Sequence, residues 1–142
     1  MSKYSVPVSM IGIAVLGLSL AVAADEARVS HEDCAKTCSD CQRSCEMCSA
    51  HCTMLIGEGK KEHLATLHTC RDCATVCSAA ASIVARKGPF AEIICMSCAD
   101  ACKQCAIECE KKPGDAMMKS CAEQCRKCEK ACQEMLNRTV AN

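Results

Sequence analysis

The chain has 142 residues, which allows a single domain of ordinary size. Its 17 basic and 17 acidic residues balance, so the composition does not indicate binding to nucleic acid or to a strongly acidic partner. Cysteine stands out instead, with 18 copies, whereas Tyr4 and Phe90 are the only Phe, Tyr or Trp residues. A core of cysteine and small aliphatic side chains buries little apolar area, so we expect the metal-free fold to be weak for its length.

The N-terminal segment has the pattern of a signal peptide. Lys3 supplies a minimal basic region, residues 8–22 are apolar and uncharged, and Ala21–Ala24 offers small-residue cleavage sites. We therefore assign residues 1–24 to a signal peptide and residues 25–142 to one Cys-rich metal-binding domain, and we expect an exported, periplasmic or extracytoplasmic protein. The alternative is an uncleaved membrane anchor, although the apolar run is short for a spanning helix. A membrane partner is expected only in that case.

The first helix is predicted to begin near His31. Ser30 is a good N-cap, and Asp33 follows three residues later as in a capping box. Gly57 and Gly59 are expected to end this helix.

Three more helices are predicted, over about residues 60–87, 90–112 and 116–138. Gly88 and Pro89 break the chain before the third helix, with Pro89 suited to its first turn, and Asp115 can cap the fourth. No alternating strand pattern competes with these helices. Short links between long helices imply antiparallel neighbours, so the fold class is all-α, an up-down four-helix bundle with a Cys-lined core.

The cysteines recur at steps of three and four residues along each predicted helix. They are Cys34, Cys38, Cys41, Cys45, Cys48, Cys52, Cys70, Cys73, Cys77, Cys95, Cys98, Cys102, Cys105, Cys109, Cys121, Cys125, Cys128 and Cys132. A mean step of 3.5 residues is the inward-facing seam of a bundled helix, and here thiols occupy that seam. Residues four apart share a helical face, so each Cys-x-x-x-Cys pair can close on one ion.

Thiolate is the soft ligand that selects Cu(I), zinc or iron–sulfur clusters. Unbroken helices offer two thiolates at a time, which favours Cu(I) over a closed tetrahedral zinc site. If each thiolate bridges two ions, the chain holds multiple Cu(I) ions, roughly fifteen to twenty. A zinc or mixed-metal thiolate buffer and a disulfide-stapled exported structural module remain open alternatives. Iron–sulfur binding is disfavoured, because its usual cysteine runs lie on loops with different spacing.

Catalysis is not expected. No Ser/His/Asp or paired-carboxylate arrangement stands out, and thiols buried among thiols are poor nucleophiles. We therefore assign neither catalytic residues nor residues for an organic cofactor.

In its repeated Cys-x-x-x-Cys and Cys-x-x-Cys steps on four successive helices, the chain resembles the copper storage proteins over about Ser30 to Arg138. The resemblance implies a homotetramer of four-helix bundles that stores or buffers Cu(I) and catalyses no reaction. It also implies that copper enters at one bundle end furnished with Met and His. The leader resembles the exported branch of that family, which is associated with a twin-arginine signal; this chain has no twin-arginine pair.

Antiparallel packing brings the end of the first helix and the start of the second together with the end of the third and the start of the fourth. We expect copper to enter at this end, where His63 and Met118 are the candidate ligands beyond the cysteines, because thioether and imidazole bind Cu(I) more weakly than bridging thiolate. His and Met residues elsewhere at the two ends are weaker candidates: His51, Met54 and Met117 at this end, and His31 and Met135 at the other.

Overall fold

The computed structural model describes residues 29–140, with side chains described as far as Asn137. Within this range the chain forms α-helices and one short 3₁₀ helix, and no strand. The elements are α1 (His31–Gly57), η1 (Lys61–His63), α2 (Leu64–Ala85), α3 (Ala91–Glu110) and α4 (Ala116–Val140). The all-α prediction is confirmed. The predicted signal peptide, residues 1–24, lies outside the described residues.

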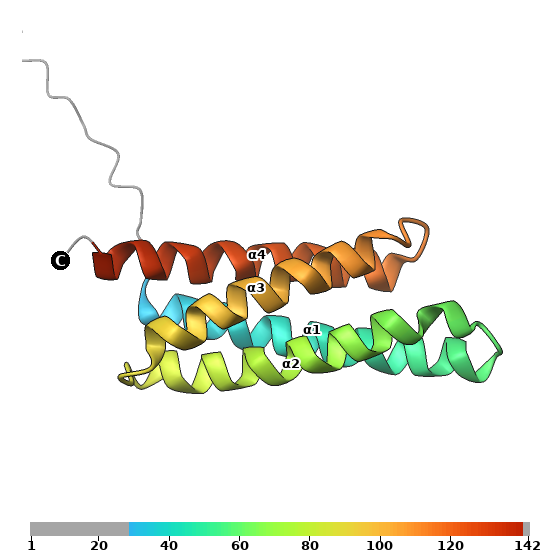
Figure 1. Cartoon of the computed structure of the whole chain (residues 1–142), viewed down its shortest axis with the longest axis horizontal. Helices are drawn as coiled ribbons and strands as arrows, with labels where there is room; N and C mark the ends of the chain where they lie inside the picture. The colour runs from blue at the N-terminus through green and yellow to red at the C-terminus, as the bar shows by residue number, and fades with distance from the viewer. Residues whose placement is uncertain (1–28, 141–142) are drawn as a thin grey trace, which may run out of the picture.

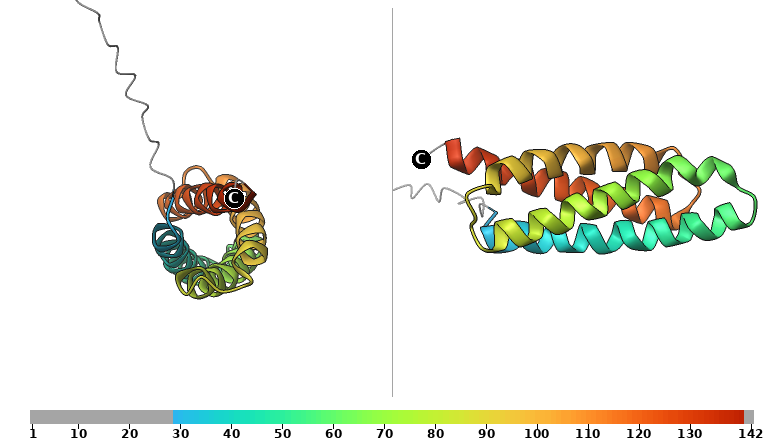
Figure 2. Two further views of the ribbon diagram at one scale, coloured as in Figure 1. Left: turned by 90° about the vertical axis from the view of Figure 1, so that its left-hand side faces the viewer. Right: turned by 60° about the horizontal axis from the view of Figure 1, so that its bottom comes forward.

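The helices run up and down in chain order and form a closed ring (Figure 1). α1 packs beside α2 and α4, and α3 packs beside α2 and α4. Among the described residues, the diagonal pairs α1/α3 and α2/α4 have no Cα atoms within 8 Å of each other. Viewed along the bundle, the helices surround a common axis (Figure 2), so one face of every helix points to the same interior.

Both ends of α1 follow the predicted chemistry. The Asp33 N–H donates to the Ser30 hydroxyl at 3.0 Å, and the Ser30 N–H donates to the Asp33 carboxylate at 3.3 Å, which completes the capping box. At the other end, the Lys60 N–H donates to the Leu55 carbonyl at 3.0 Å across Gly59. Gly59 has φ +90°, a conformation that favours glycine, so it stops the helix in a Schellman-type turn.

The junctions around α2 differ in detail from the prediction. The second helix begins with η1, and α2 proper starts four residues later than expected, at Leu64; neither His63 nor Lys60 caps its element with a side chain. At its far end, Lys87 takes φ 51° where a glycine would be relaxed. Pro89 lies ahead of α3 rather than in its first turn, because that helix begins at Ala91.

The interior is built from thiols with small companions. Each of the four helices contributes its cysteine row, and buried alanines flank the rows: Ala35, Ala74, Ala80, Ala81, Ala99, Ala106, Ala122 and Ala131. Small flanking side chains let the backbones approach and bring the cysteines to the axis. Among the described residues, no helix combines the length and hydrophobicity needed to cross a bilayer.

Candidate metal centre

Every one of the eighteen cysteines is buried, with Cys73 exposed by 1% and the others by 0%. All are free thiols, and the closest described sulfur pair, Cys77 and Cys102, is 3.5 Å apart. A disulfide needs about 2.05 Å between sulfurs. The structure therefore places a large set of unpaired thiols inside the bundle and gives no support to a disulfide-stapled module.

Sulfur atoms meet mainly between helices. Cys45 of α1 contacts Cys125 of α4 at 3.6 Å and Cys105 of α3 at 3.9 Å. The second contact spans the diagonal of the ring, where the backbones stay apart. Cysteine is thus long enough to reach the axis from every side, and the sulfurs fill the space that the ring encloses.

Groups of four sulfurs lie close enough to share an ion. Two of these groups take one cysteine from each helix, with all sulfurs within 4.8 Å of one another: Cys41, Cys77, Cys102 and Cys128, and Cys48, Cys70, Cys109 and Cys121. Two others draw on α1 twice or on α4 twice: Cys41, Cys45, Cys73 and Cys125, and Cys45, Cys105, Cys121 and Cys125. Several cysteines, Cys41 and Cys45 among them, belong to more than one group, which is the arrangement that bridging thiolates require.

The cysteine pairs along one helix take part in larger groups of sulfurs. Of the close sulfur contacts described, only Cys73 and Cys77, 3.9 Å apart, join residues of the same helix. Several four-sulfur groups nevertheless contain a Cys-x-x-x-Cys pair, such as Cys41 and Cys45, together with sulfurs from other helices. Four sulfurs around a zinc ion at about 2.3 Å would lie roughly 3.8 Å apart, so these groups also fit a tetrahedral zinc site. Helical presentation alone therefore does not exclude zinc.

Burial and neighbouring sulfurs set the protonation of the thiols. Burial, together with the nearby Cys48 thiol, raises the pKa of the Cys52 thiol to about 12. At the opposite end of the interior, a hydrogen bond from Cys132 lowers the pKa of the Cys95 thiol. The contact with Cys34 and burial have the larger, opposite effect, and the pKa of Cys95 is raised to about 12. Midway along the bundle, hydrogen bonds from Cys102 and Cys125 lower the pKa of Cys41. Neighbouring thiols and burial also raise the pKa of Cys45 and Cys102 in the same region. Thiolates are the metal ligands, so loading must displace protons from thiols along the whole interior.

The predicted uptake end contains one buried histidine. His63 and Met118 are both buried there, with Met118 fully enclosed. His63 Nδ1 and the hydroxyl of Thr66, three residues further along, are buried and hydrogen-bonded to no described residue. His63 Nε2 lies 3.8 Å from the Glu62 carboxylate, beyond normal hydrogen-bonding distance. The imidazole thus keeps an unpaired nitrogen at the end of the thiol interior. Thr66 was not predicted, because a lone threonine carries no metal-ligand signal.

His51 has a different role from a free ligand. Its Nε2 lies 2.7 Å from the Asp115 carboxylate, whose other oxygen accepts the N–H groups of Met117 and Met118 at 3.0 Å each. Burial alone would raise the pKa of Asp115. The His51 contact and these N–H groups have the larger effect, so the pKa of Asp115 is lowered. Asp115 therefore caps α4, as predicted, and also joins α4 to α1. The sequence did not reveal the second bond, since the two residues lie 64 positions apart.

The remaining candidates lie in contrasting surroundings. Met54 is exposed to solvent, and Met117 is partly buried against the core. At the other end, Met135 is buried in the core and His31 is partly exposed. Only Met118 and His63 therefore combine burial with a position at the predicted uptake end.

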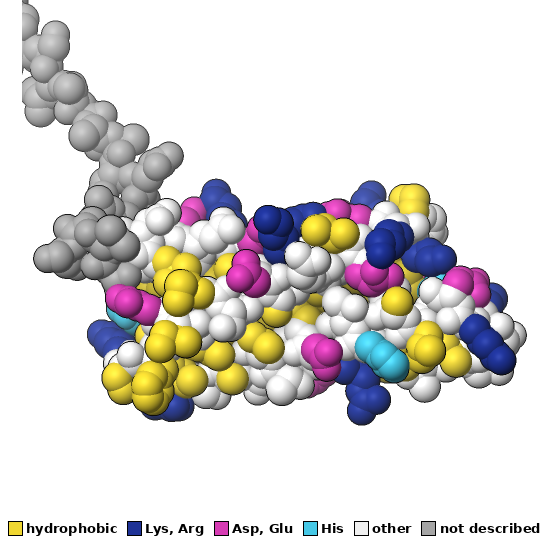
Figure 3. All heavy atoms as spheres, viewed as in Figure 1, with side chains coloured by type: hydrophobic (Ala, Val, Ile, Leu, Met, Phe, Trp, Pro, Cys, Tyr) yellow, Lys and Arg dark blue, Asp and Glu magenta, His cyan; other side chains and the backbone are white. Residues whose placement is uncertain are grey.

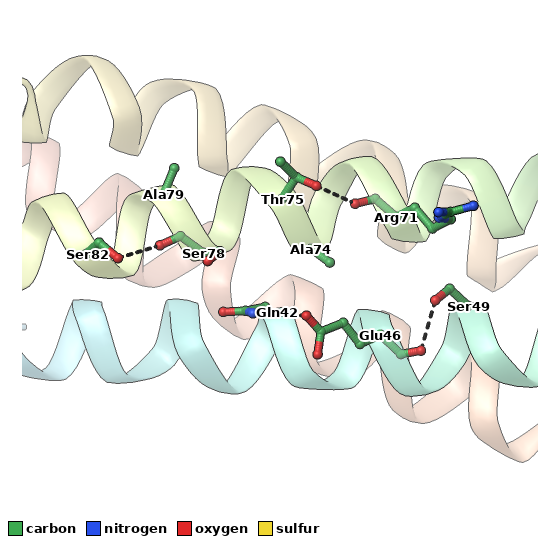
Figure 4. A pocket seen from close by; sticks show the side chains of 9 residues that line it. All are labelled: Gln42, Glu46, Ser49, Arg71, Ala74, Thr75, Ser78, Ala79 and Ser82. Atoms are coloured by element: carbon green, nitrogen blue, oxygen red, sulfur yellow. Dashed lines mark hydrogen bonds between the residues drawn. The ribbon is translucent and has the colours of Figure 1, made fainter.

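A surface groove between α1 and α2 is separate from the thiols. It has a volume of about 550 Å³ and contains no cysteine in its lining, which includes Glu46, Arg71, Thr75 and Ser78 (Figure 4). The Thr75 hydroxyl donates to the Arg71 carbonyl at 3.0 Å, so it is engaged within its own helix. The thiol interior is the stronger candidate for a functional site.

Comparison with known protein families gives a match over most of the chain. A family model described as copper storage protein matches residues 27–137. No curated protein matches the chain. The matched range takes in every cysteine and the four helical rows that carry them.

Proposed function

Since the chain belongs to the copper storage protein family, copper is its cargo, and we propose that it holds many copper ions as Cu(I) between the thiolates inside the bundle. The observation that carries this proposal is the burial of all eighteen cysteines with their sulfurs in mutual reach. Cu(I) is a soft ion that accepts two or three thiolates, and shared thiolates can bridge neighbouring ions. The chain catalyses no reaction in this proposal.

The expected copper capacity follows from the sharing of each thiolate between two copper ions. If each thiolate bridges two ions and each ion takes two thiolates, copper and cysteine approach parity, at roughly fifteen to twenty ions per chain. Parity also keeps the interior near neutral, because each Cu(I) offsets one thiolate. Unpaired thiolates in the same place would be costly to bury.

His63 and Met118 are proposed as the uptake ligands. The unpaired Nδ1 of His63 and the enclosed thioether of Met118 lie where the α1–α2 and α3–α4 links meet. Imidazole and thioether hold Cu(I) less tightly than bridging thiolate, so they can pass the ion inward. His63→Ala is expected to slow loading while leaving the final copper content unchanged.

Titration of reduced protein with Cu(I) against a competing chromophoric chelator tests the proposal. Saturation near parity with cysteine supports it, and saturation at one or two ions contradicts it. The matched control is the same protein with its thiols alkylated under denaturing conditions and then returned to native buffer, which should bind little copper.

A zinc or mixed-metal thiolate buffer is the second candidate. The four-sulfur groups favour it, since they match a tetrahedral site in ligand number and spacing. Competition separates the two: Cu(I) should displace zinc completely from the protein, whereas a zinc buffer would retain zinc in the presence of equal Cu(I). Metal analysis of protein from copper-grown cells, with thiols counted on the same sample, gives the native content.

We also propose where the protein is located and how it assembles. We infer export to the periplasm or another extracytoplasmic compartment from the leader, and assembly as a homotetramer from the family resemblance. No nucleic-acid partner is proposed, in line with the balanced charge. N-terminal sequencing of secreted protein would test cleavage after Ala23 or Ala24.

A further inference from the structure

The outward face of α3 carries a second row at the same spacing as its cysteines. The inner row is Cys95, Cys98, Cys102, Cys105 and Cys109, and the outer row is Ile93, Met96, Asp100, Lys103 and Ile107. Both advance by three, four, three and four residues, and the outer row starts two residues earlier, which places it on the opposite face of the helix. A repeat of 3.5 residues is the pattern of a helix that packs along another helix.

The outer row is exposed in the single chain. Met96 is 51% exposed and Ile93 58%, and Ile107 is also exposed. Phe90, the one aromatic residue among those described, is exposed just before the row begins. Figure 3 shows hydrophobic side chains gathered at the end of the molecule where α2 ends and α3 begins. Neighbouring apolar residues that stay exposed indicate a contact surface rather than scattered surface variation.

The two charges at the centre of the row have no partner in the chain. Neither Asp100 nor Lys103 forms an ion pair with any residue in the described part of the protein. α1 offers a contrast: at equivalent steps, its Asp40 carboxylate already binds Lys36 and Arg43 of the same helix. The charges on the α3 row are therefore free to pair with another molecule.

The order of residues makes the row complementary to itself. Met96 lies four residues before Asp100, and Ile107 lies four residues after Lys103. When two copies of α3 are laid antiparallel about a two-fold axis between residues 101 and 102, Asp100 of each copy faces Lys103 of the other, and Met96 faces Ile107. A parallel arrangement would instead set Asp100 against Asp100. A polar pair at the centre of an apolar seam fixes register and direction in helix pairs.

We propose that the outer row of α3 is an isologous interface with a second copy of this chain. Met96 of each copy packs antiparallel against Ile107 of the other, over about 17 Å of helix, and the central Asp100 and Lys103 form two ion pairs across the axis. A two-fold contact of this kind uses the same patch on both subunits. It supplies one interface for the proposed assembly, and it depends on neither copper nor the thiol interior.

Charge reversal gives a sharp test, read by sedimentation velocity of the full reduced chain over a range of concentrations. Asp100→Lys alone and Lys103→Asp alone should each raise the dissociation constant about tenfold or more, because like charges then face each other across the axis. The double variant should recover the original association, since it restores opposite charges. A double variant that associates as weakly as the single variants would overturn the proposal.

A second pair of variants tests the apolar part. Met96→Glu should dissociate the contact, whereas Met47→Glu, at a 54% exposed site on α1, should leave it intact. A chain that is monomeric throughout, or one in which Met47→Glu dissociates and Met96→Glu does not, contradicts the proposal. Copper capacity should be the same in every variant, so a failure of copper binding would count against the proposed function and not against this interface.

Discussion

Cys52 is the last thiol of the α1 row, and its protonation makes the stability of the metal-free fold depend on pH. Burial raises the pKa of this thiol from 9.0 to about 12, so the folded chain holds the proton more tightly than the unfolded chain does. The stabilisation is complete below about pH 9 and is lost as the pH rises towards 12. We therefore expect the metal-free protein to lose stability across this alkaline range. Urea unfolding on both sides of the range measures it, and Cys52→Ala should show a smaller decline; an equal decline would contradict the assignment.

Asp115 joins two helices through one carboxylate, and two substitutions separate its roles. Asp115→Ala removes both the α4 cap and the His51 contact and should lower the free energy of unfolding by about 1–2 kcal/mol. Asp115→Asn keeps a capping oxygen and should lose less than about 1 kcal/mol. Because the pKa of Asp115 is lowered, its contribution is present above its ordinary value of 3.8 and disappears on acidification. Urea unfolding is the measurement, with Asp72→Asn as an exposed control; equal stability of all variants would rule out the cap.

At the level of the helix, α2 has the shortest thiol row. After Cys70, Cys73 and Cys77 its buried face continues with Ala80 and Val84. Cys77 contacts Cys98 of the antiparallel α3 at 3.7 Å, so one turn further Ala80 lies level with Cys95. This end of the interior therefore has fewer sulfurs than its geometry could accommodate.

Extending that row should increase copper capacity. Ala80→Cys places a new thiol beside Cys95 and is expected to raise saturation by about one ion, following the near-equal ratio of Cu(I) to bridging thiolate. Ala79→Cys adds a thiol on the exposed side of the same helix and is the matched control, which should leave the tightly held copper unchanged. The Cu(I) titration above measures both. An equal gain in the two variants would show that burial among the other thiols does not determine binding.

The helices themselves were predictable because their signals are local. Ser30 and Asp33 lie three residues apart, and the three-and-four spacing of cysteine is visible within any one helix. The grouping of sulfurs was not predictable in detail. Whether Cys45 meets Cys125 of α4 or the next cysteine of its own helix depends on the register of neighbouring helices, which spacing along one helix does not encode. The His51–Asp115 bond was missed for the same reason.

At the scale of the whole molecule, the bundle separates its buried thiols from solvent. All the thiols face the axis of the ring, while the charged side chains are spread over the exterior (Figure 3). The exposed apolar side chains include Ile93, Met96 and Ile107 of α3. A core dominated by thiol and alanine offers little apolar burial, and Val84, Met118 and Met135 are its larger apolar side chains. In the proposed loaded state copper is a structural element as well as cargo, because the sulfur groups that would share the bridged ions draw on three or four helices.

Copper loading should therefore raise the thermal stability of the chain. A ligand that binds only the folded state at a hundred times its dissociation constant contributes about 2.7 kcal/mol per site. For a domain of this size even one such site corresponds to a rise in Tm of about 10 °C, and many sites add to it. Calorimetry of reduced protein with increasing Cu(I) should show Tm rising until saturation, with protons released to a weakly buffered solution as thiols ionise. Mg²⁺ is the control, since this hard cation prefers oxygen ligands and should leave Tm unchanged. A constant Tm through the Cu(I) titration would mean that the buried sulfurs are not where copper binds.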